Sequence, residues 1–219
     1  METGTKVYGI SVILTLFNSK VFLKRALDSV INQTYKDCEL IIVDDGSDDD
    51  TETILFPILK KNDNFKYIRH SNRKHPLSLN TGIINTSGQY ITFLDSDDEY
   101  LCDHLELRFN FLNENTHIDI LHSHPKIIGT EEDRYVPDAR DNSKLIHLKD
   151  CVIGGTFFGK RKVFEELQGF ENIYSHDFHF FKRANSKFTV LMFDSPTYIY
   201  HRDNPESVIS KMKERTNIQ

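Results

Sequence analysis

Short apolar segments that alternate with amphipathic ones most strongly limit how this chain of 219 residues can fold. Ile10–Leu16 (ISVILTL) and Leu40–Val43 (LIIV) are almost entirely apolar, as expected of strands buried on both faces of a parallel sheet. Between them, Val21–Asn32 has apolar side chains at helical spacing, which predicts an amphipathic helix. This order indicates a parallel α/β arrangement with right-handed crossovers.

The same alternation continues to residue 112. We predict further strands at Phe65–Arg69 and Tyr90–Leu94, and helices over Asp48–Lys61, Leu77–Asn85 and Asp103–Leu112. Asp48, Asp49 and Asp50 are expected at a helix start, where carboxylates suit the free amides. The predicted fold class is α/β, with a doubly wound, mostly parallel central sheet flanked by helices.

The second half of the chain is less regular. We predict strands at 118–123, 126–128, 189–193 and 198–201, and helices at 162–167 and 177–184. The charge-rich stretch 131–143 predicts a long loop, and the tail 211–219 is expected to fray. The length suggests a single domain, with one half at 8–112 and another at 113–210.

Charge and cysteine content argue against several classes of protein. The chain has 27 Lys and Arg against 33 Asp and Glu, so its net charge of -6 gives no support to nucleic-acid binding. Its 3 cysteines lack CxxC spacing, which argues against a disulfide framework or a structural zinc site and fits a reducing cytosol. The polar start and the short apolar run after it do not suit a signal peptide or a membrane span. We expect a soluble cytoplasmic protein, and peripheral association with the inner face of a membrane stays open.

Two acidic clusters directly follow predicted strands. Asp44–Ser47 (DDGS) comes after LIIV, and Asp95–Asp98 (DSDD) comes after YITFL. The carboxyl ends of parallel strands form the ligand crevice of an open sheet, so both clusters should face one cleft. Crowded carboxylates repel one another unless they are neutralised, and Mg²⁺ and Mn²⁺ take such oxygen ligands. The clusters predict a metal-phosphate site, and the alternative is a pair of turns that cap the following helices.

Four segments resemble, in order and spacing, the nucleotide-sugar domain of family 2 inverting glycosyltransferases with the GT-A fold. They are SVILTLFN (11–18), SVINQTYKDCELIIVDDGSDDDT (29–51), NTGI (80–83) and GQYITFLDSDD (88–98). The resemblance runs from residue 12 to residue 112. It implies the GT-A nucleotide-diphospho-sugar transferase fold and a sugar-transferring enzyme of polysaccharide biosynthesis.

The resemblance also implies a nucleoside pocket at the ends of the first two strands. Thr15 and Phe17 would line the base pocket. Asp45 would accept a hydrogen bond from the base, with Asp44 nearby. A uridine diphosphate sugar is the favoured donor, although these residue types do not select one base.

Asp95-Ser96-Asp97 corresponds to the DxD motif of the family. By this resemblance Asp95 would face the ribose or the metal, and Asp97 would bind a Mn²⁺ or Mg²⁺ ion on the diphosphate. Asp98 would orient these two residues. Such an ion would neutralise the charge that develops on the leaving diphosphate.

Inverting transfer needs a general base that takes the proton of the acceptor hydroxyl. The family carries a Glu-Asp pair at the start of a late helix, and the similar phrase here begins at His176-Asp177. Asp177 would therefore be the catalytic base. His176 replaces the acidic residue and would influence the base or contact the acceptor, while an ordinary helix cap is the alternative for this pair.

A second departure concerns positive charge near the diphosphate. The family has an arginine before the fourth strand, where this chain has Leu79. Arg73, Lys74 or His75 would supply the charge instead, unless this basic trio is a solvated loop.

Basic residues near the end of the chain offer further contacts. The phrase from Tyr200 to Ser207 is similar to a family phrase that contains tyrosine, arginine, histidine and serine. The resemblance implies that His201 and Arg202 approach the diphosphate.

The expected partners are a nucleotide diphosphate sugar and a glycan or lipid-linked acceptor. One alternative is a relative that binds the nucleotide sugar without transferring it, motivated by Leu79 and His176. Another is a phosphate-transfer enzyme with an aspartate nucleophile, which expects DxD after the first strand, where this chain has TLFN. The donor sugar, the acceptor and the oligomeric state are left open.

Overall fold

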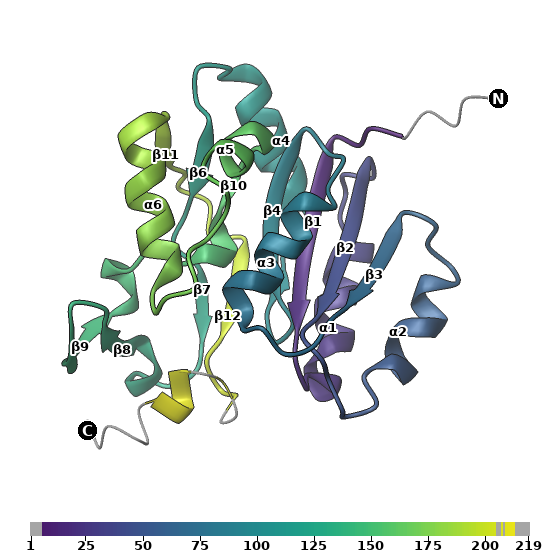
Figure 1. Cartoon of the computed structure of the whole chain (residues 1–219). Helices are drawn as coiled ribbons and strands as arrows, with labels where there is room; N and C mark the ends of the chain where they lie inside the picture. Colours follow the sequence, from purple (N-terminus) through teal and green to yellow (C-terminus); the bar gives the residue numbers. More distant parts are fainter. Residues whose placement is uncertain (1–5, 205–206, 208, 213–219) are drawn as a thin grey trace.

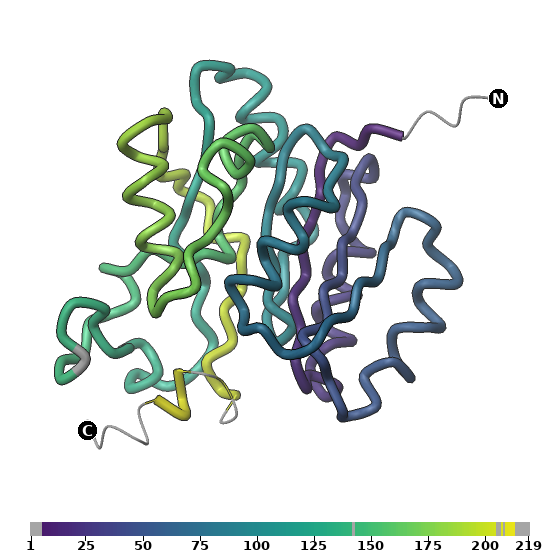
Figure 2. The backbone as a smooth tube through the Cα atoms, viewed as in Figure 1, coloured from purple at the N-terminus to yellow at the C-terminus, as the bar shows by residue number. Residues whose placement is uncertain are grey.

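The computed structural model describes residues 6–204, 207 and 209–212. Its centre is a seven-stranded sheet in the order β11-β6-β10-β4-β1-β2-β3, with helices on both faces (Figure 1). The predicted α/β class and the mostly parallel, doubly wound sheet are confirmed. Figure 2 shows the purple-to-blue first half beside the largely green second half along this sheet. The tail predicted to fray, 211–219, falls mostly on 213–219, which lie outside the described residues; residues 211 and 212 are helical.

The strands of the first half are parallel and directly paired. β1 (Ile10–Leu16) lies between β2 (Cys38–Asp44) and β4 (Tyr90–Asp95), and β3 (Phe65–Arg69) pairs with the far side of β2. Every residue of β1 and β2 is buried, which explains why their sequences are so apolar.

Helices cover the two faces of the sheet and form a separate apolar core on each. One face packs against α1 (Lys20–Ile31), α2 (Glu52–Leu59) and α4 (His104–Glu114), and the other against α3 (His75–Ile84), α5 (Arg161–Glu166) and α6 (His176–Lys187). Alternate side chains of β1 enter the two cores, because Val12 and Leu14 face the first and Ile13 the second. No helix within the described part of the chain has the length and apolar character to cross a membrane.

The start of α2 differs from the sequence prediction. The helix begins at Glu52, and Asp50 has a left-handed backbone with φ 57°, which is incompatible with a helix that starts at Asp48. Asp49 accepts hydrogen bonds from the backbone N–H groups of Lys20 at 2.8 Å and Thr51 at 3.2 Å. Its carboxylate therefore satisfies an amide at the start of α1 as well as one before α2.

The second half extends the sheet through strands that are too short to show an alternation of apolar and polar residues in the sequence. β6 (Ile120–His122) and β11 (Val190–Met192) are shorter than predicted. β10 (Phe158–Lys160), which the sequence pattern did not reveal, pairs antiparallel with both β4 and β6. A separate sheet joins β5 (Glu99–Tyr100), β12 (Tyr198–His201) and β7 (Lys126–Ile128).

The predicted long loop at 131–143 is wrong. The 3-10 turn η1 (Glu132–Arg134) leads into a hairpin of β8 (Tyr135–Asp138) and β9 (Asp141–His147). The hairpin is a two-stranded sheet of its own, in which most described side chains are at least partly exposed. Such a ribbon buries little apolar surface, so its strands lack the hydrophobic alternation that would have identified them.

A buried carboxylate joins the first four strands at the end of the sheet opposite the acidic clusters. Glu39 of β2 is 0% exposed and accepts hydrogen bonds from Ser11 Oγ of β1 at 2.7 Å and Lys66 Nζ of β3 at 2.8 Å. Ser87, just before β4, donates from its backbone N–H and its hydroxyl. Burial would raise the pKa of Glu39, but the Lys66, Ser11 and Ser87 donors outweigh burial and lower it.

We predict that Glu39→Gln lowers the free energy of unfolding at neutral pH by about 1–3 kcal/mol, because a charged acceptor of several bonds is lost. The folded-state pKa of Glu39 is lowered, so its stabilisation is present above the unfolded-state pKa and is lost as pH falls through the folded-state value. Urea denaturation at a series of pH values should show the variant and the wild type converging as pH falls. Glu114→Gln, at an exposed site, is the control. A stability difference that stays constant with pH would contradict the prediction.

Candidate active site

The two predicted acidic clusters lie at the same edge of the sheet. In the β1 pairings, Leu16 is opposite Asp44 of β2, and Thr15 is opposite Asp95 of β4. Thr15 Oγ1 donates to Asp95 Oδ1 at 3.4 Å. Phe17 follows directly after β1 and is 48% exposed, so its ring is available to a ligand.

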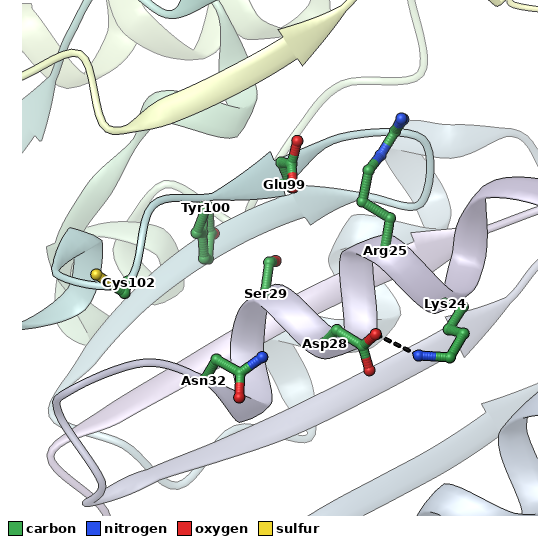
Figure 3. Close-up of a pocket in the computed structure, with 8 residues that line it drawn as sticks. All are labelled: Lys24, Arg25, Asp28, Ser29, Asn32, Glu99, Tyr100 and Cys102. Atoms are coloured by element: carbon green, nitrogen blue, oxygen red, sulfur yellow. Dashed lines mark hydrogen bonds and ion pairs between the residues drawn. The ribbon is translucent and has the colours of Figure 1, made fainter.

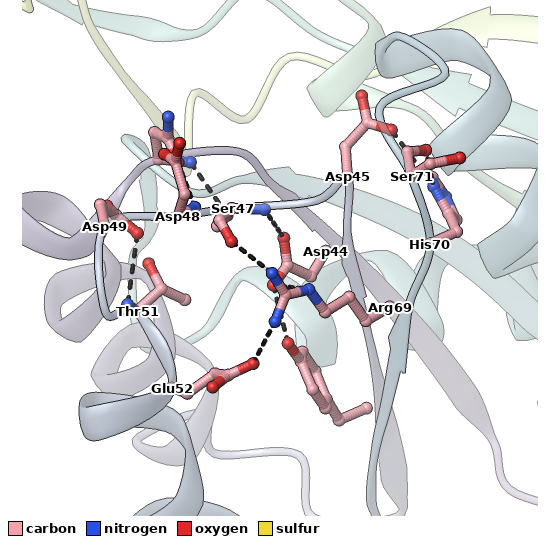
Figure 4. A network of polar contacts seen from close by, with 12 residues as sticks. Asp44, Asp45, Ser47, Asp48, Asp49, Thr51, Glu52, Arg69, His70 and Ser71 are labelled. Carbon is pink, nitrogen blue, oxygen red and sulfur yellow. Dashed lines mark hydrogen bonds and ion pairs between the residues drawn. The ribbon is translucent and has the colours of Figure 1, made fainter.

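Asp44 and Asp45 have different surroundings (Figure 4). The Asp44 carboxylate is completely buried and accepts hydrogen bonds from Ser47 N at 2.8 Å and Tyr67 OH at 2.7 Å. Arg69 Nε lies 3.9 Å from Asp44 Oδ2. Asp44 thus stabilises the DDGS turn from the protein interior, and both of its carboxylate oxygens already accept hydrogen bonds from protein groups.

Asp45 holds the segment that leads from β3 to α3. Its two carboxylate oxygens accept hydrogen bonds from the backbone N–H groups of Arg73 at 2.6 Å and Lys74 at 3.0 Å, and His70 Nδ1 lies 3.2 Å away. Lys74 adopts φ 78° and ψ 152°, a backbone conformation that non-glycine residues seldom take. The side chains of Arg73 and Lys74 are exposed. Asp45 therefore stabilises a strained turn whose next residue is His75.

The DxD carboxylates are unequally neutralised. Asp95 Oδ1 lies 2.9 Å from His75 Nε2, and Asp97 Oδ2 accepts a hydrogen bond from Asn204 Nδ2 at 3.0 Å. Burial would raise the pKa of Asp95, but His75 outweighs burial and lowers it. Burial and the nearby Asp95 raise the pKa of Asp97. A cation beside Asp97 would relieve this unfavourable charge.

Asp98 faces the protein interior. It is 0% exposed and accepts hydrogen bonds from Tyr198 OH and from His201 N, the latter at 2.8 Å. Burial and the charges of Asp97 and Asp95 raise its pKa well above the usual range. Asp98 therefore joins the DxD loop to β12. Its orienting role toward Asp95 and Asp97 stays a prediction.

His201 and Arg202 lie close to this junction, and their side chains contact neighbouring residues. His201 Nε2 is 2.9 Å from Glu99 Oε1. Arg202 is 3% exposed, and its Nε donates to the backbone oxygen of Asp133 at 3.3 Å. The predicted approach of these two residues to a diphosphate stays a prediction.

Asp177 lies in the first turn of α6, as predicted. Its carboxylate accepts hydrogen bonds from Phe178 N at 2.8 Å, Gly154 N at 3.3 Å and Ser175 Oγ at 3.4 Å. Burial raises the pKa of Asp177, which brings it closer to the value that suits a general base. A Cβ on Gly154 would lie 3.2 Å from Asp177 Cβ, so this glycine permits the close approach.

Two histidines lie between the DxD loop and α6. The rings of His75 and His176 meet edge to face with centroids 5.2 Å apart. Burial and the neighbouring His75 lower the pKa of His176 to about 3, which keeps its ring neutral. Burial would lower the pKa of His75, but the Asp95, Asp177 and Asp97 carboxylates outweigh burial and raise it.

Two contacts in this region escaped the sequence prediction. Tyr198, which binds Asp98, is predicted only as a strand residue, and Asn204, which binds Asp97, lies within the phrase Tyr200–Ser207 but is not predicted as a site residue. Both follow their partners by 100 residues or more, and no local pattern in the chain connects positions so far apart.

The DxD carboxylates suit a hard divalent ion that is shared with a phosphate ligand. The described residues contain no group of three or more His, Cys, Asp and Glu side chains able to hold a metal ion. Mg²⁺ is typically held by one or two carboxylates together with substrate phosphates and water. Asp95 and Asp97 match this type of site, in which a diphosphate and water complete the coordination.

A cavity of about 500 Å³ lies between α1 and the segment that contains β5 (Figure 3). Arg25 and Glu99 are among its lining residues, and none of the predicted site residues lines it. Arg25 donates a hydrogen bond to the backbone oxygen of Asp97. The cavity is therefore adjacent to the back of the DxD loop and separate from the carboxylates themselves.

Comparison with known proteins identifies the class to which this fold and site belong. The family model described as "Glycosyl transferase family 2" matches residues 11–203. An uncharacterized glycosyltransferase of Rickettsia prowazekii is 31% identical over 195 residues, which are 82% of this chain and 60% of that protein. The GalNAc(5)-diNAcBac-PP-undecaprenol beta-1,3-glucosyltransferase of Campylobacter jejuni is 39% identical over 107 residues, which are 48% of this chain and 35% of that protein. The matched part of the chain thus spans less than two thirds of either relative.

Solved structures agree on the fold. TarS 1-349 of S. aureus in complex with UDP-GlcNAc has a TM-score of 0.72 at 19% identity, covering 92% of this chain and 60% of that one. The mannosyltransferase PcManGT from Pyrobaculum calidifontis, in complex with GDP-Man and Mn²⁺, has a TM-score of 0.68 at 17% identity, covering 89% and 57%. The architecture is thus that of a GT-A glycosyltransferase. The chain belongs to glycosyl transferase family 2, as its sequence motifs predicted.

We predict that Tyr198→Phe lowers the free energy of unfolding by about 1–3 kcal/mol, because it leaves the buried Asp98 carboxyl with one hydrogen bond fewer. Urea denaturation measures this loss. Tyr90→Phe is a matched control, since Tyr90 OH binds the exposed Asn113 at 2.9 Å and its removal should cost less. Equal losses in the two variants would contradict the special role of the Asp98 contact.

Proposed function

We propose that this glycosyltransferase is a metal-dependent, inverting enzyme that moves a sugar from a nucleotide diphosphate donor to a hydroxyl of a glycan or lipid-linked acceptor. The observation that carries the proposal is that His75 links the DxD motif to the start of α6: its Nε2 lies 2.9 Å from Asp95 Oδ1, and its ring packs against that of His176, the residue before Asp177. Asp95 and Asp177 come from the two halves of the chain. The link between them supports one site for the leaving diphosphate and for the acceptor proton.

The donor would bind along the carboxyl ends of β1, β2 and β4. Thr15, Phe17 and Asp45 would contact the nucleoside, since Phe17 is exposed directly after β1 and Asp45 lies directly after β2. A UDP-sugar is the proposed donor, by resemblance and because a structural neighbour holds UDP-GlcNAc. Another neighbour holds GDP-Man, so the base is part of the test.

Asp97, with Asp95, would hold a Mn²⁺ or Mg²⁺ ion. When bound, the ion would offset the negative charge that grows on the leaving diphosphate. The raised pKa of Asp97 and the hard oxygen donors at the site support this assignment. A structural neighbour was solved with Mn²⁺.

Asp177 would take the proton of the acceptor hydroxyl as that oxygen attacks the anomeric carbon. The backbone N–H groups of Gly154 and Phe178 orient the carboxylate, and its raised pKa favours proton uptake. Attack from the side opposite the leaving diphosphate in one step inverts the anomeric configuration. The neutral His176 at the start of the same helix would border the acceptor.

The acceptor would be a glycan or a lipid-linked sugar, with peripheral association at the inner face of the membrane. The name of the Campylobacter jejuni relative describes an undecaprenol-linked substrate, which supports this part of the proposal. No nucleic-acid partner is proposed, given the net charge of -6.

We predict that Asp97→Ala abolishes the metal-dependent part of donor binding. UDP with Mn²⁺ should raise the melting temperature of the wild type more than UDP with EDTA does, and the variant should lose this difference. GDP, ADP and dTDP in the same assay identify the base. Asp63→Ala, at an exposed position before β3, is the control and should behave as the wild type. An unchanged response to Mn²⁺ in Asp97→Ala would contradict the metal assignment.

We predict that Asp177→Asn keeps donor affinity and lowers the rate of transfer by about 10²–10⁴-fold, because a general base is lost while the side-chain shape is kept. Donor affinity is measured by calorimetry, and turnover by nucleotide release with a panel of glycan and lipid-linked acceptors. Near-normal turnover in the variant would refute the base assignment. Donor binding by the wild type without turnover on any acceptor would favour the non-catalytic alternative.

A further inference from the structure

His75 occupies the centre of the proposed active site. Its Nε2 lies 2.9 Å from Asp95 Oδ1, and its ring packs against that of His176, with centroids 5.2 Å apart. The ring therefore links the DxD motif, proposed to hold the cation, with the first turn of α6, which carries the residue proposed to take the acceptor proton. In the proposed single displacement, the bond that breaks joins the anomeric carbon to the diphosphate, so the leaving diphosphate would lie at the DxD carboxylates, one of which His75 contacts.

The basic side chains around the site differ in what they can reach. Arg73 and Lys74 precede His75 directly, but both side chains are exposed, and it is their backbone N–H groups that bind Asp45. Leu79 is 3% exposed and belongs to the apolar core beneath α3. Of the basic trio in this segment, only His75 contacts a carboxylate of the DxD motif through its side chain.

Other basic side chains near the DxD loop have different partners. Arg25 donates to the backbone oxygen of Asp97, and His201 contacts Glu99 at 2.9 Å. Arg202 donates to the backbone oxygen of Asp133. Among the described residues, Asp95 and Asp97 take part in one ion pair, which joins Asp95 to His75.

The position of His75 is held from several sides. Asp45 binds the two preceding amides and stabilises the unusual backbone at Lys74, and Pro76 fixes the first turn of α3. The His176 ring packs edge to face against the His75 ring. The imidazole is thus oriented before any ligand arrives, which lowers the cost of using it in binding.

We propose that His75 is a donor-binding residue that contacts the diphosphate of the nucleotide sugar through an imidazole N–H. This inference rests on the proposed function and deepens it. An imidazole carries a nitrogen at each side of its ring, and N–H donors hydrogen-bond phosphate oxygens strongly when either group is charged. A donor placed at the leaving phosphate would help both binding and departure, because the negative charge there grows during transfer.

The test compares UDP, UMP and uridine binding to the full chain by calorimetry, with EDTA and with Mn²⁺. His75→Ala should weaken UDP binding at least tenfold under both conditions and should change UMP and uridine binding less than threefold. His75→Gln keeps an N–H donor and should recover part of the UDP affinity. His117→Ala, which removes an exposed imidazole after α4, is the matched control and should bind UDP as the wild type does.

Three outcomes would overturn the inference: unchanged UDP binding in His75→Ala, an equal loss of UDP and UMP affinity, or a similar loss in His117→Ala. Circular dichroism and melting temperature check that the variants fold, and His75→Gln provides the comparison if His75→Ala does not. Wild-type protein that binds no nucleoside diphosphate would refute the proposed function itself. Wild-type binding that is insensitive to His75 would refute this inference alone.

Discussion

The crowding of buried carboxylates after β4 is the constraint around which the site is built. Asp95, Asp97 and Asp98 repel one another, and each is balanced differently, by the His75 ring, by the Asn204 amide, and by Tyr198 with a backbone N–H. Asp97 receives a hydrogen bond from the neutral Asn204 amide, and burial and the charge of Asp95 raise its pKa; the pKa of Asp98, which faces the interior, is raised further. The uneven balance leaves one position that favours a cation and surrounds it with groups that are already held in place.

The acidic clusters combine structural and ligand-facing residues. Asp44 and Asp98 are fully buried, and their oxygens hold a turn and a strand of their own protein. Asp45 also has a structural role, since it orients the segment that delivers His75. Counting carboxylates at strand ends therefore overstates the number available to a ligand. The other carboxylates are held by hydrogen bonds within the protein, and these bonds make the remaining site rigid.

Much of the first half was predictable, because strands buried on both faces must be apolar and the helices between them must be amphipathic. β1 and β3 have the predicted bounds. The second half was less predictable for physical reasons. β10 has three residues, too few for a period, and the β8–β9 hairpin is a polar ribbon whose sequence resembles a loop. The helix that was predicted from Asp48 begins only at Glu52, because Asp50 has a left-handed backbone angle that composition does not reveal.

The sequence by itself determined the α/β alternation, the family, and the edge of the sheet where Asp45, Asp95 and Asp97 gather, because each follows a strand that can only be central. It offered Arg73, Lys74 or His75 for the positive charge that Leu79 lacks. Only the tertiary structure selected His75, since its contact with Asp95 spans 20 residues and depends on how α3 packs on the sheet. Contacts such as Tyr198 with Asp98, 100 residues apart, likewise exist only once both halves have folded together.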